Sequence, residues 1–568
     1  FHDLELVKQS VTEDSGIIVS EFRTWDRNLN FKTQDVALHD NDTLVRHLEI
    51  TNKSGKEINN FELFFYEFFT VNYIGSGDQL AYDKKNGVLN HTGKDVSFTI
   101  GSDILPEQWQ CGGVQNILTK AYDARKDAED GDLGKNSTVV AGIGLGANGN
   151  IGHHIDSLKA GEKFSINYFI SAGRNINESN KSFNQAKLKS WENVETQDLS
   201  YWKNWLAKSV KPKTEDPKTN KVYRRALITM KQDTANNGAI IASPTLLTPV
   251  YSFTWPRDGA ITAMAYLEAG YPEEAKKFFN FISTQQKENG GWAVNYFMDG
   301  SRPLWDFGDR KNEHDQIGTI PWAILEYYKH TKDISWLKGK WPVVKKACNF
   351  LIDFNSEKDL MTSCRDLWEL STDKSWTFTN AAAYAGLKAG AEIAALTGDK
   401  NSEFKFNAVA TRMKEAIYNN LWSESGQYYI RVINIQNGQQ DMKVEAANLG
   451  LSYPFSVFDY KDPRMLKTAE KIYSTLSSEQ SGIKRYTDDR YYDGNPWPAT
   501  TDWLAIYYAK AGNKTRALQL HNTVTNYAFK TGSLMLGEQF DEEKDLWVSA
   551  FPLTWSASKY VLGTLEIY

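Results

Sequence analysis

The sequence of 568 residues predicts a multidomain α and β protein, with an antiparallel β-sandwich followed by a closed double ring of paired helices. Two observations support this fold class. Short segments with the two-residue period of half-buried strands, separated by turn residues, occupy the first part of the chain. From about Thr219 the apolar residues follow the 3.6-residue period of helices instead. The length also favours more than one domain.

Residues 1–206 are predicted to form the β-sandwich domain. Residues 164–170 alternate between apolar and polar side chains, apart from Phe169, and residues 60–73 combine aromatic side chains with high strand propensity. Residues 186–206 have a helical pattern and are expected to close this domain. The following stretch, 207–218, contains two prolines and alternating charges, which is typical of a linker.

Residues 219–568 are predicted to form the helical domain. The helical pattern recurs twelve times, near 219–236, 257–270, 272–288, 315–331, 335–354, 379–397, 401–421, 442–452, 463–477, 496–511, 513–529 and 553–566. No sequence repeat of fixed period accompanies these helices, which disfavours a solenoid. In a closed ring the loops at one end converge, so functional side chains are expected in those loops.

Composition limits the classes of partner. The net charge is −6 without strong bias, which argues against nucleic acid or an anionic membrane as the main partner. No apolar run approaches the roughly 20 residues of a membrane span. Three scattered cysteines give no disulfide framework and no zinc signature, so we expect neither metal nor cofactor. The chain begins at Phe1, which indicates processing or trimming upstream; secreted and cytoplasmic locations both stay open, as does the oligomeric state.

The segment Asp366-Leu-Trp-Glu369 carries the first candidate catalytic residue. A carboxyl group beside an indole loses hydration, which disfavours its anion and favours a protonated acid near neutral pH. We therefore expect Glu369 to donate a proton to a glycosidic oxygen. The alternative is that Trp368 is a core residue and Glu369 a solvated or salt-bridged side chain.

Two earlier loops carry candidate sugar-binding residues. Arg257 and Asp258 open a helix and together offer a fork of donors and a bidentate acceptor, which suits adjacent sugar hydroxyls. Asp258 alternatively stabilises the helix N-terminus. Trp305 is a candidate sugar platform. Asp315 is either a binding residue or the N-cap of the next helix.

Two later loops complete the set. Arg485 precedes a tyrosine-rich stretch that ends at Trp497. Glu538 follows a glycine that leaves room for a ligand to approach, and it precedes the last helix. Two carboxylates on separate loops, among Trp, Tyr and Arg side chains, match the requirements of glycoside hydrolysis, in which one group is an acid and the other activates water or attacks carbon.

In order and kind, these motifs resemble the glucoamylase family of inverting glycoside hydrolases, glycoside hydrolase family 15, in its bacterial and archaeal form. That form has an N-terminal β-sandwich before an (α/α)6 barrel catalytic domain. The resemblance covers about Pro244 to Leu565 and extends to earlier residues only as architecture. It implies that Glu369 is the general acid and that Glu538, in Gly-Glu-Gln-Phe-Asp, is the general base.

The resemblance also implies a set of substrate-binding residues. They are Tyr251, Trp255, Arg257, Asp258, Trp305, Asp315, Leu367, Trp368, Arg485, Trp497 and Trp555. The chain departs from the family pattern in two places. The spacing after Trp305 is longer, with Glu313-His314 where the family has Gln, and Leu370 replaces the second Glu after the acid.

The expected function is exo-acting, inverting release of β-D-glucose from non-reducing ends of α-linked gluco-oligosaccharides or starch. Inversion predicts carboxyl groups roughly 6.5–9.5 Å apart, with room for water between them. Because Leu370 leaves the next sugar's recognition open, trehalose, isomaltose and dextran are alternative substrates. An alternative of another class is a non-catalytic glucan-binding or regulatory protein on the same barrel.

Overall fold

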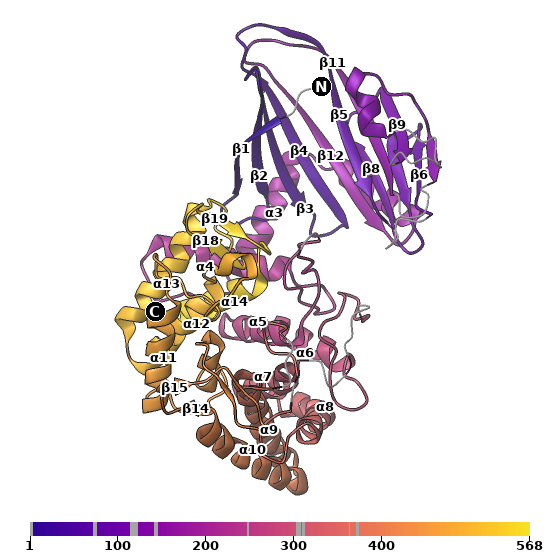
Figure 1. Cartoon of the computed structure of the whole chain (residues 1–568). Helices are drawn as coiled ribbons and strands as arrows, with labels where there is room; N and C mark the ends of the chain where they lie inside the picture. The colour runs from indigo at the N-terminus through magenta and orange to yellow at the C-terminus, as the bar shows by residue number, and fades with distance from the viewer. Residues whose placement is uncertain are drawn as a thin grey trace. The chain divides into compact units, whose positions relative to one another are not determined.

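The computed structural model of the chain divides into two compact units, Phe1–Trp205 and Leu206–Tyr568 (Figure 1). The residues whose structure is described are 4–71, 77–113, 123–140, 146–246, 249–302, 308, 313–362, 364–370 and 374–568.

The first unit contains two antiparallel sheets. The larger sheet has the order β1 (Leu4–Val11), β2 (Ile18–Thr24), β3 (Leu29–Ala37), β4 (Thr43–Asn52), β12 (Lys163–Gly173), β8 (Ser97–Ser102), β7 (Val88–Thr92), β6 (Gln79–Asp83) and β10 (Thr138–Val140). The smaller sheet has the order β5 (Ile58–Phe69), β11 (Ala147–Leu158) and β9 (Gln108–Gly113). Phe65 of the small sheet stacks on Tyr168 of the large sheet at 4.3 Å between ring centroids, so apolar side chains of both sheets share one core.

Short and long helices flank these sheets. Near the small sheet lie α1 (Ala124–Asp127) and the 3-10 turn η1 (Ala128–Asp130). Helix α2 (Ile176–Lys187) packs on the outer face of the large sheet, where Phe183 meets Phe169. Asn175 caps α2 by accepting hydrogen bonds from two backbone N–H groups of its first turn. Helix α3 (Trp191–Leu206) follows. The β-sandwich predicted from the sequence is thus confirmed.

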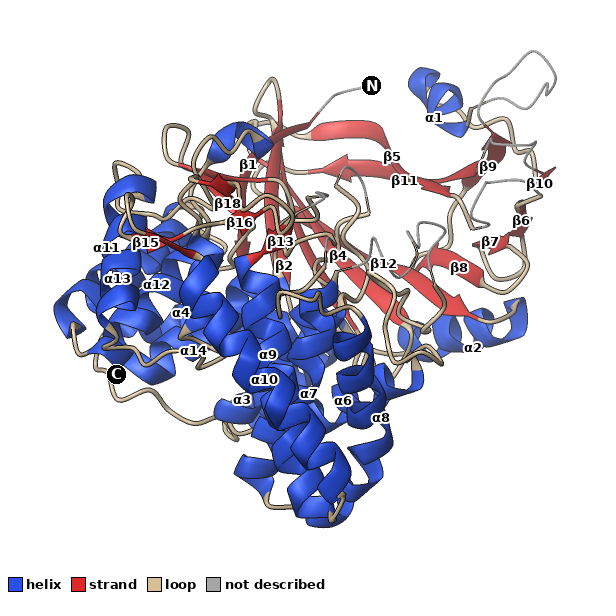
Figure 2. Cartoon of the chain, turned by 60° about the horizontal axis from the view of Figure 1, so that its bottom comes forward, coloured by secondary structure: helices blue, strands red, loops and turns tan. Residues whose placement is uncertain are grey.

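The second unit is a double ring of helices, which confirms the predicted (α/α)6 barrel. Within the described residues, the inner ring runs through α5 (Pro256–Glu268), α7 (His314–Thr331), α9 (Thr377–Thr397), the 3-10 helix η2 (Ala446–Leu451), α12 (Pro498–Ala511) and α14 (Thr554–Ile567), and α14 closes the ring on α5. The outer partners, in matching order, are α6 (Pro272–Thr284), α8 (Ile334–Asp353), α10 (Lys400–Asn420), α11 (Pro463–Leu476), α13 (Lys514–Lys530) and α4 (Pro217–Gln232). The pair α9 and α10 lies side by side in Figure 2.

Composition explains which helices are inside. The inner α9 is buried along nearly its whole length and is rich in alanine and glycine, whereas the outer α11 buries one stripe only. A Cβ atom on Gly386 of α9 would lie 2.7 Å from the Cα of Gly318 on α7, so glycine at this crossing lets the two inner helices approach closely. The predicted helix at 442–452 is shorter than expected and is the 3-10 helix η2.

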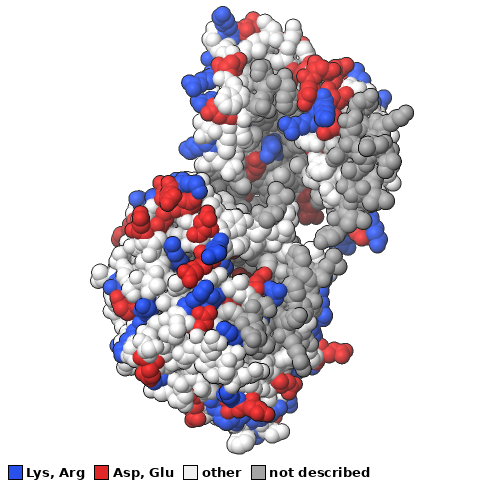
Figure 3. All heavy atoms as spheres, in the orientation of Figure 1, with Lys and Arg blue, Asp and Glu red and all other residues white. Residues whose placement is uncertain are grey.

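The loops between the helices of this unit contain short strands and a 3-10 turn. They are β13 (Ser375–Trp376), β14 (Trp422–Ser423), β15 (Tyr428–Tyr429), β16 (Val432–Ile433), β17 (Gln440–Asp441), β18 (Gln539–Asp541), β19 (Leu546–Val548) and the 3-10 turn η3 (Tyr491–Gly494). The three cysteines are buried free thiols. No helix among the described residues combines the length and apolarity that crossing a membrane requires. Acidic and basic side chains are interspersed on the face shown in Figure 3.

Candidate active site

A cavity of about 800 Å³ opens at the end of the barrel where the inner helices begin. Its walls come from loops that precede α5, α9, η2, α12 and α14 or from the first residues of these helices. Of the residues predicted from the sequence, those that line it are Tyr251, Trp255, Arg257, Asp258, Leu367, Trp368, Glu369, Arg485, Trp497, Glu538 and Trp555. Eleven of the predicted side chains therefore lie in one cavity, although they come from segments up to about three hundred residues apart in the sequence.

Among the described residues, one predicted residue, Asp315, is not part of the cavity wall. Trp305 lies outside the described residues. Asp315 is fully buried in the first turn of α7 and accepts a hydrogen bond from Nη1 of Arg257 at 3.0 Å. The alternative in which Asp315 caps α7 is wrong, because Glu313 occupies the N-cap position and makes no capping bond.

Glu369 differs from the sequence-based expectation in its surroundings. Its side chain is exposed in the cavity, and its backbone has a positive φ of 60°. Its contact is with Trp255, whose indole Nε1 donates to Oε1 of Glu369 at 2.8 Å, and not with the neighbouring Trp368. The predicted loss of hydration against Trp368 is therefore absent. A substrate that fills the cavity would remove water from Glu369 instead.

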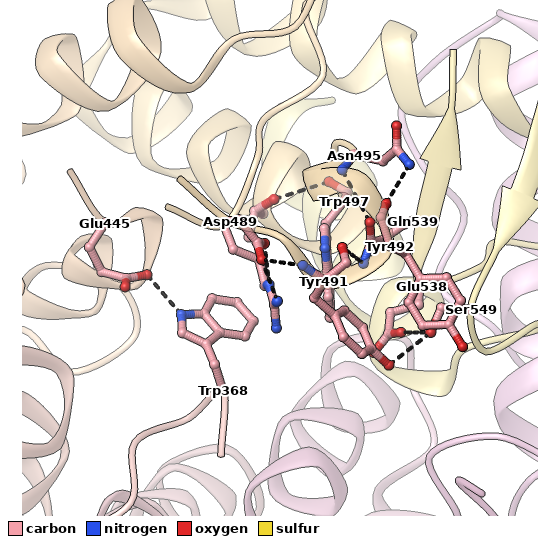
Figure 4. Close-up of polar contacts among 12 residues, drawn as sticks. Trp368, Glu445, Asp489, Tyr491, Tyr492, Asn495, Trp497, Glu538, Gln539 and Ser549 are labelled. Carbon is pink, nitrogen blue, oxygen red and sulfur yellow. Dashed lines mark hydrogen bonds and ion pairs between the residues drawn. The ribbon is translucent and has the colours of Figure 1, made fainter. Parts of the chain in front are cut away.

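Glu538 is buried, with 2% of the residue exposed, yet it lines the same cavity. Ser549, on the loop after β19, donates a hydrogen bond to its Oε2 (Figure 4). The Ser549 hydroxyl also pairs with the Tyr491 hydroxyl at 3.0 Å, and Tyr491 pairs with Tyr251 at 3.1 Å. Burial raises the pKa of Glu538 to about 7, against the opposing effects of the Ser549 hydrogen bond and the charge of Arg485.

Gly537, just before Glu538, has a role different from the one expected. A Cβ atom there would lie 3.0 Å from the Trp547 ring, so the glycine makes room for the hairpin of β18 and β19. Glu538 is fixed to that hairpin by its backbone N–H, which donates to the carbonyl of Ala550 at 2.9 Å. The space beside the glycine is thus filled by the protein rather than by a ligand.

Arg257 is the centre of a buried charge cluster at the wall of the cavity. Its guanidinium contacts three carboxylates: Nη1 bonds to Glu313 and Asp315, and Nε lies 3.3 Å from Asp258. Burial raises the pKa of all three acids, most strongly that of Glu313. One cation thus faces three acids, of which Asp258 reaches the cavity wall.

Arg485 stands among aromatic side chains on another wall. Its Nε and Nη2 form a two-bond pair with Asp489, at 2.7 and 2.8 Å. Its guanidinium carbon lies about 5 Å from the ring centroids of Trp368 and Trp497. The indole N–H groups of Trp497 and Trp555 are buried and have no hydrogen-bond partner among the described residues.

Four residues outside the set predicted from the sequence complete the site. Tyr491 and Ser549 surround Glu538, and Arg431 with Glu445 lies behind Trp368. Tyr491 belongs to the tyrosine-rich stretch between Arg485 and Trp497, but nothing local in the sequence marks the other three. Among the described residues, no group of three or more His, Cys, Asp and Glu side chains is arranged to hold a metal ion.

Comparison with known proteins gives a consistent picture. The family model for glycosyl hydrolases family 15 matches residues 217–304 and 313–562. An uncharacterised glycosyl hydrolase of Methanocaldococcus jannaschii is 29% identical over 99% of this chain and 89% of its own length. A glucoamylase of Clostridium sp. is 26% identical over 73% of this chain and 62% of its own length. Trehalase 1 of Sulfolobus acidocaldarius is 24% identical over 56% of each chain.

A solved structure supports the fold. A bacterial glucoamylase complexed with acarbose superposes with a TM-score of 0.81, covering 100% of this chain and 85% of that chain, at 19% identity.

Proposed function

Because the chain belongs to family 15 of the glycosyl hydrolases and is therefore a glycoside hydrolase, we propose that it releases β-D-glucose from the non-reducing ends of α-linked gluco-oligosaccharides or starch, with inversion. The observation that carries this proposal is the pair of carboxyl groups in one cavity. Glu369 is exposed within it and Glu538 is buried at its wall, on loops 169 residues apart in the sequence (538 − 369).

In the proposed reaction, Glu369 gives its proton to the glycosidic oxygen as the C1–O bond breaks. A water molecule attacks C1 from the opposite face, and Glu538 takes a proton from that water. Arg257, Asp258 and Arg485 hold the terminal glucose, and the side chains of Trp497 and Trp555 line the cavity around it. The two carboxyl groups differ in environment, since Glu369 is exposed in the cavity and Glu538 is buried at its wall.

The stereochemistry of the product tests the proposal. Proton NMR during early hydrolysis of an α-linked substrate is expected to show β-glucose first, followed by slow mutarotation to the α-anomer. Early α-glucose would instead indicate a retaining mechanism, which places the second carboxylate close enough to attack carbon.

A second candidate substrate class is α,α-trehalose or isomaltose. Leu370 lines the cavity next to Glu369, at the position where the family pattern has a second Glu. The leaving sugar would therefore contact an apolar side chain at this position. A trehalase is also among the relatives. A panel of maltose, isomaltose, trehalose and soluble starch, assayed for released glucose, distinguishes these substrates.

The pH dependence should report on Glu538. A base works only when ionised, so kcat/KM should fall as pH falls through about 7, the pKa of this carboxyl. Replacing Ser549 with alanine removes a hydrogen bond that favours the anion. The pKa of Glu538 then rises, and the acidic limb should move upward by about 1–2 pH units, because a hydrogen bond to a charged group is worth about 1.5–3 kcal/mol.

The matched control is Ser556→Ala, which removes a hydroxyl that donates to the carbonyl of Gly537 and not to Glu538. Its acidic limb should stay at the wild-type pH. An unmoved or lowered limb in Ser549→Ala would contradict the role of Glu538 as base.

A further inference from the structure

The loop that carries Glu369 is folded around the side chain of Asp366. Oδ1 of Asp366 accepts hydrogen bonds from the backbone N–H groups of Trp368, at 3.0 Å, and Leu370, at 2.7 Å. The Asp366 backbone also bonds to Glu369 and Leu370, at 3.0 and 3.1 Å. These four bonds span Glu369 and hold it at its positive φ, a conformation that a non-glycine residue adopts only when its surroundings impose it.

A second layer fixes this loop from behind. Oε1 of Glu445 accepts from the indole Nε1 of Trp368 at 2.8 Å (Figure 4). Oε2 of the same Glu445 lies 2.9 Å from Nε of Arg431, whose Nη2 lies 3.8 Å from Oδ2 of Asp366. Arg431 thus lies between Glu445 and Asp366. Glu445 fixes the side chain of Trp368, and Asp366 fixes the backbone around Glu369.

The three charged groups are buried, each with 5% exposure or less, and Arg431 also packs with its guanidinium carbon 3.9 Å from the ring centroid of Tyr486. Glu445 is itself fixed, because it is the N-cap of η2 and accepts from the N–H of Ala447 at 3.2 Å. Buried ion pairs contribute little net stability compared with apolar side chains of equal size. A role in positioning accounts better for a triad that contacts the loop carrying the candidate acid.

We propose that Arg431 and Glu445 are positioning residues for the general acid, acting through Trp368 and Asp366 to keep Glu369 aimed at the glycosidic oxygen. This inference rests on the proposed function. It predicts a specific defect: proton donation to the leaving group weakens, while the water attack directed by Glu538 is unaffected. Displacement of a reacting group by about 1 Å can lower the rate roughly 100-fold.

A pair of substrates separates these two halves of the reaction. In an α-linked oligosaccharide the leaving alkoxide needs the proton of Glu369. In α-D-glucosyl fluoride the C1–F bond breaks to release fluoride, which needs no proton, while water still adds to C1 and loses its proton to Glu538. The ratio of kcat values on the two substrates therefore reports on the acid alone.

Two variants carry the test. Glu445→Gln keeps an oxygen for Trp368 but presents no charge to Arg431, and Arg431→Lys keeps the charge but loses the planar fork that spans both acids. Each should lower kcat on the preferred oligosaccharide roughly 10–100-fold with little change in KM, and leave kcat on α-D-glucosyl fluoride close to wild type. If one variant does not fold, the other still decides.

The matched control is Asp502→Asn, which disrupts a fully buried acid paired with His521 on α12 and α13, away from the cavity walls. Its effect, whatever the size, should be equal on both substrates. An equal fall on both substrates in the Glu445 and Arg431 variants would overturn the inference while leaving the proposed function intact. A wild-type protein that releases glucose from neither substrate would overturn both.

Discussion

Replacing Glu369 with glutamine is expected to lower kcat on α-linked glucosides by about 10²–10⁴-fold, the range that a general acid contributes. Glutamine has nearly the same shape and keeps an oxygen that can accept from the Trp255 indole. Its amide N–H groups are not acidic, however, so it cannot transfer a proton to the leaving oxygen. Affinity for a sugar ligand should persist, because the other residues of the cavity are unchanged. Steady-state kinetics, with binding of glucose measured by calorimetry, would measure both quantities.

The control for this variant is Glu392→Gln, which makes the same chemical change at a half-exposed carboxyl on α9 outside the cavity. Its kcat should equal that of the wild type. A Glu369→Gln protein with near-normal kcat would remove Glu369 from the mechanism, and a loss of ligand binding together with kcat would point to a damaged cavity instead.

The architecture could be predicted from sequence because it depends on periodicity. Alternating residues such as 164–170 do form the strand β12, and the change to helical spacing near Thr219 falls at α4. The position of the cavity also followed from topology, since the predicted loops all precede inner helices. In these segments the periodicity of apolar residues in the sequence agrees with the strands and helices of the structure, because burial of apolar side chains determines both.

The environment of the acid could not be predicted because adjacent residues need not share surroundings. Trp368 and Glu369 are neighbours in sequence, but the positive φ of Glu369 sends the two side chains to different partners, Glu445 and Trp255. No local pattern encodes such a turn in the backbone. Arg431 and Ser549 were missed for the same reason: they act through contacts made by distant segments.

The second large effect is expected on stability. Replacing Arg257 with methionine leaves Asp258, Glu313 and Asp315 buried together without their cation. Removing one partner of a buried ion pair costs about 3–5 kcal/mol, because the charges that remain are neither solvated nor compensated. We expect a loss of unfolding free energy of this size at pH 8, measured by urea titration.

The same variant should show a distinctive pH dependence. The pKa values of these three acids are already raised by burial, and removal of Arg257 raises them further. A carboxyl whose folded pKa exceeds its unfolded pKa stabilises the fold at low pH, and this stabilisation is lost as pH rises through the folded pKa. Arg257→Met should therefore regain part of its lost stability between pH 8 and pH 5.

Arg516→Met provides the comparison, because this arginine pairs with Glu470 at the surface, where such a pair contributes at most about 1 kcal/mol. If Arg257→Met were no less stable than Arg516→Met, or if its deficit were the same at both pH values, the three acids would not depend on Arg257. The three carboxyl groups would then have to be protonated in the native protein, so that their burial does not require the charge of Arg257. Such a cluster would hold Asp258 at the cavity wall as a hydrogen-bond donor rather than as an acceptor.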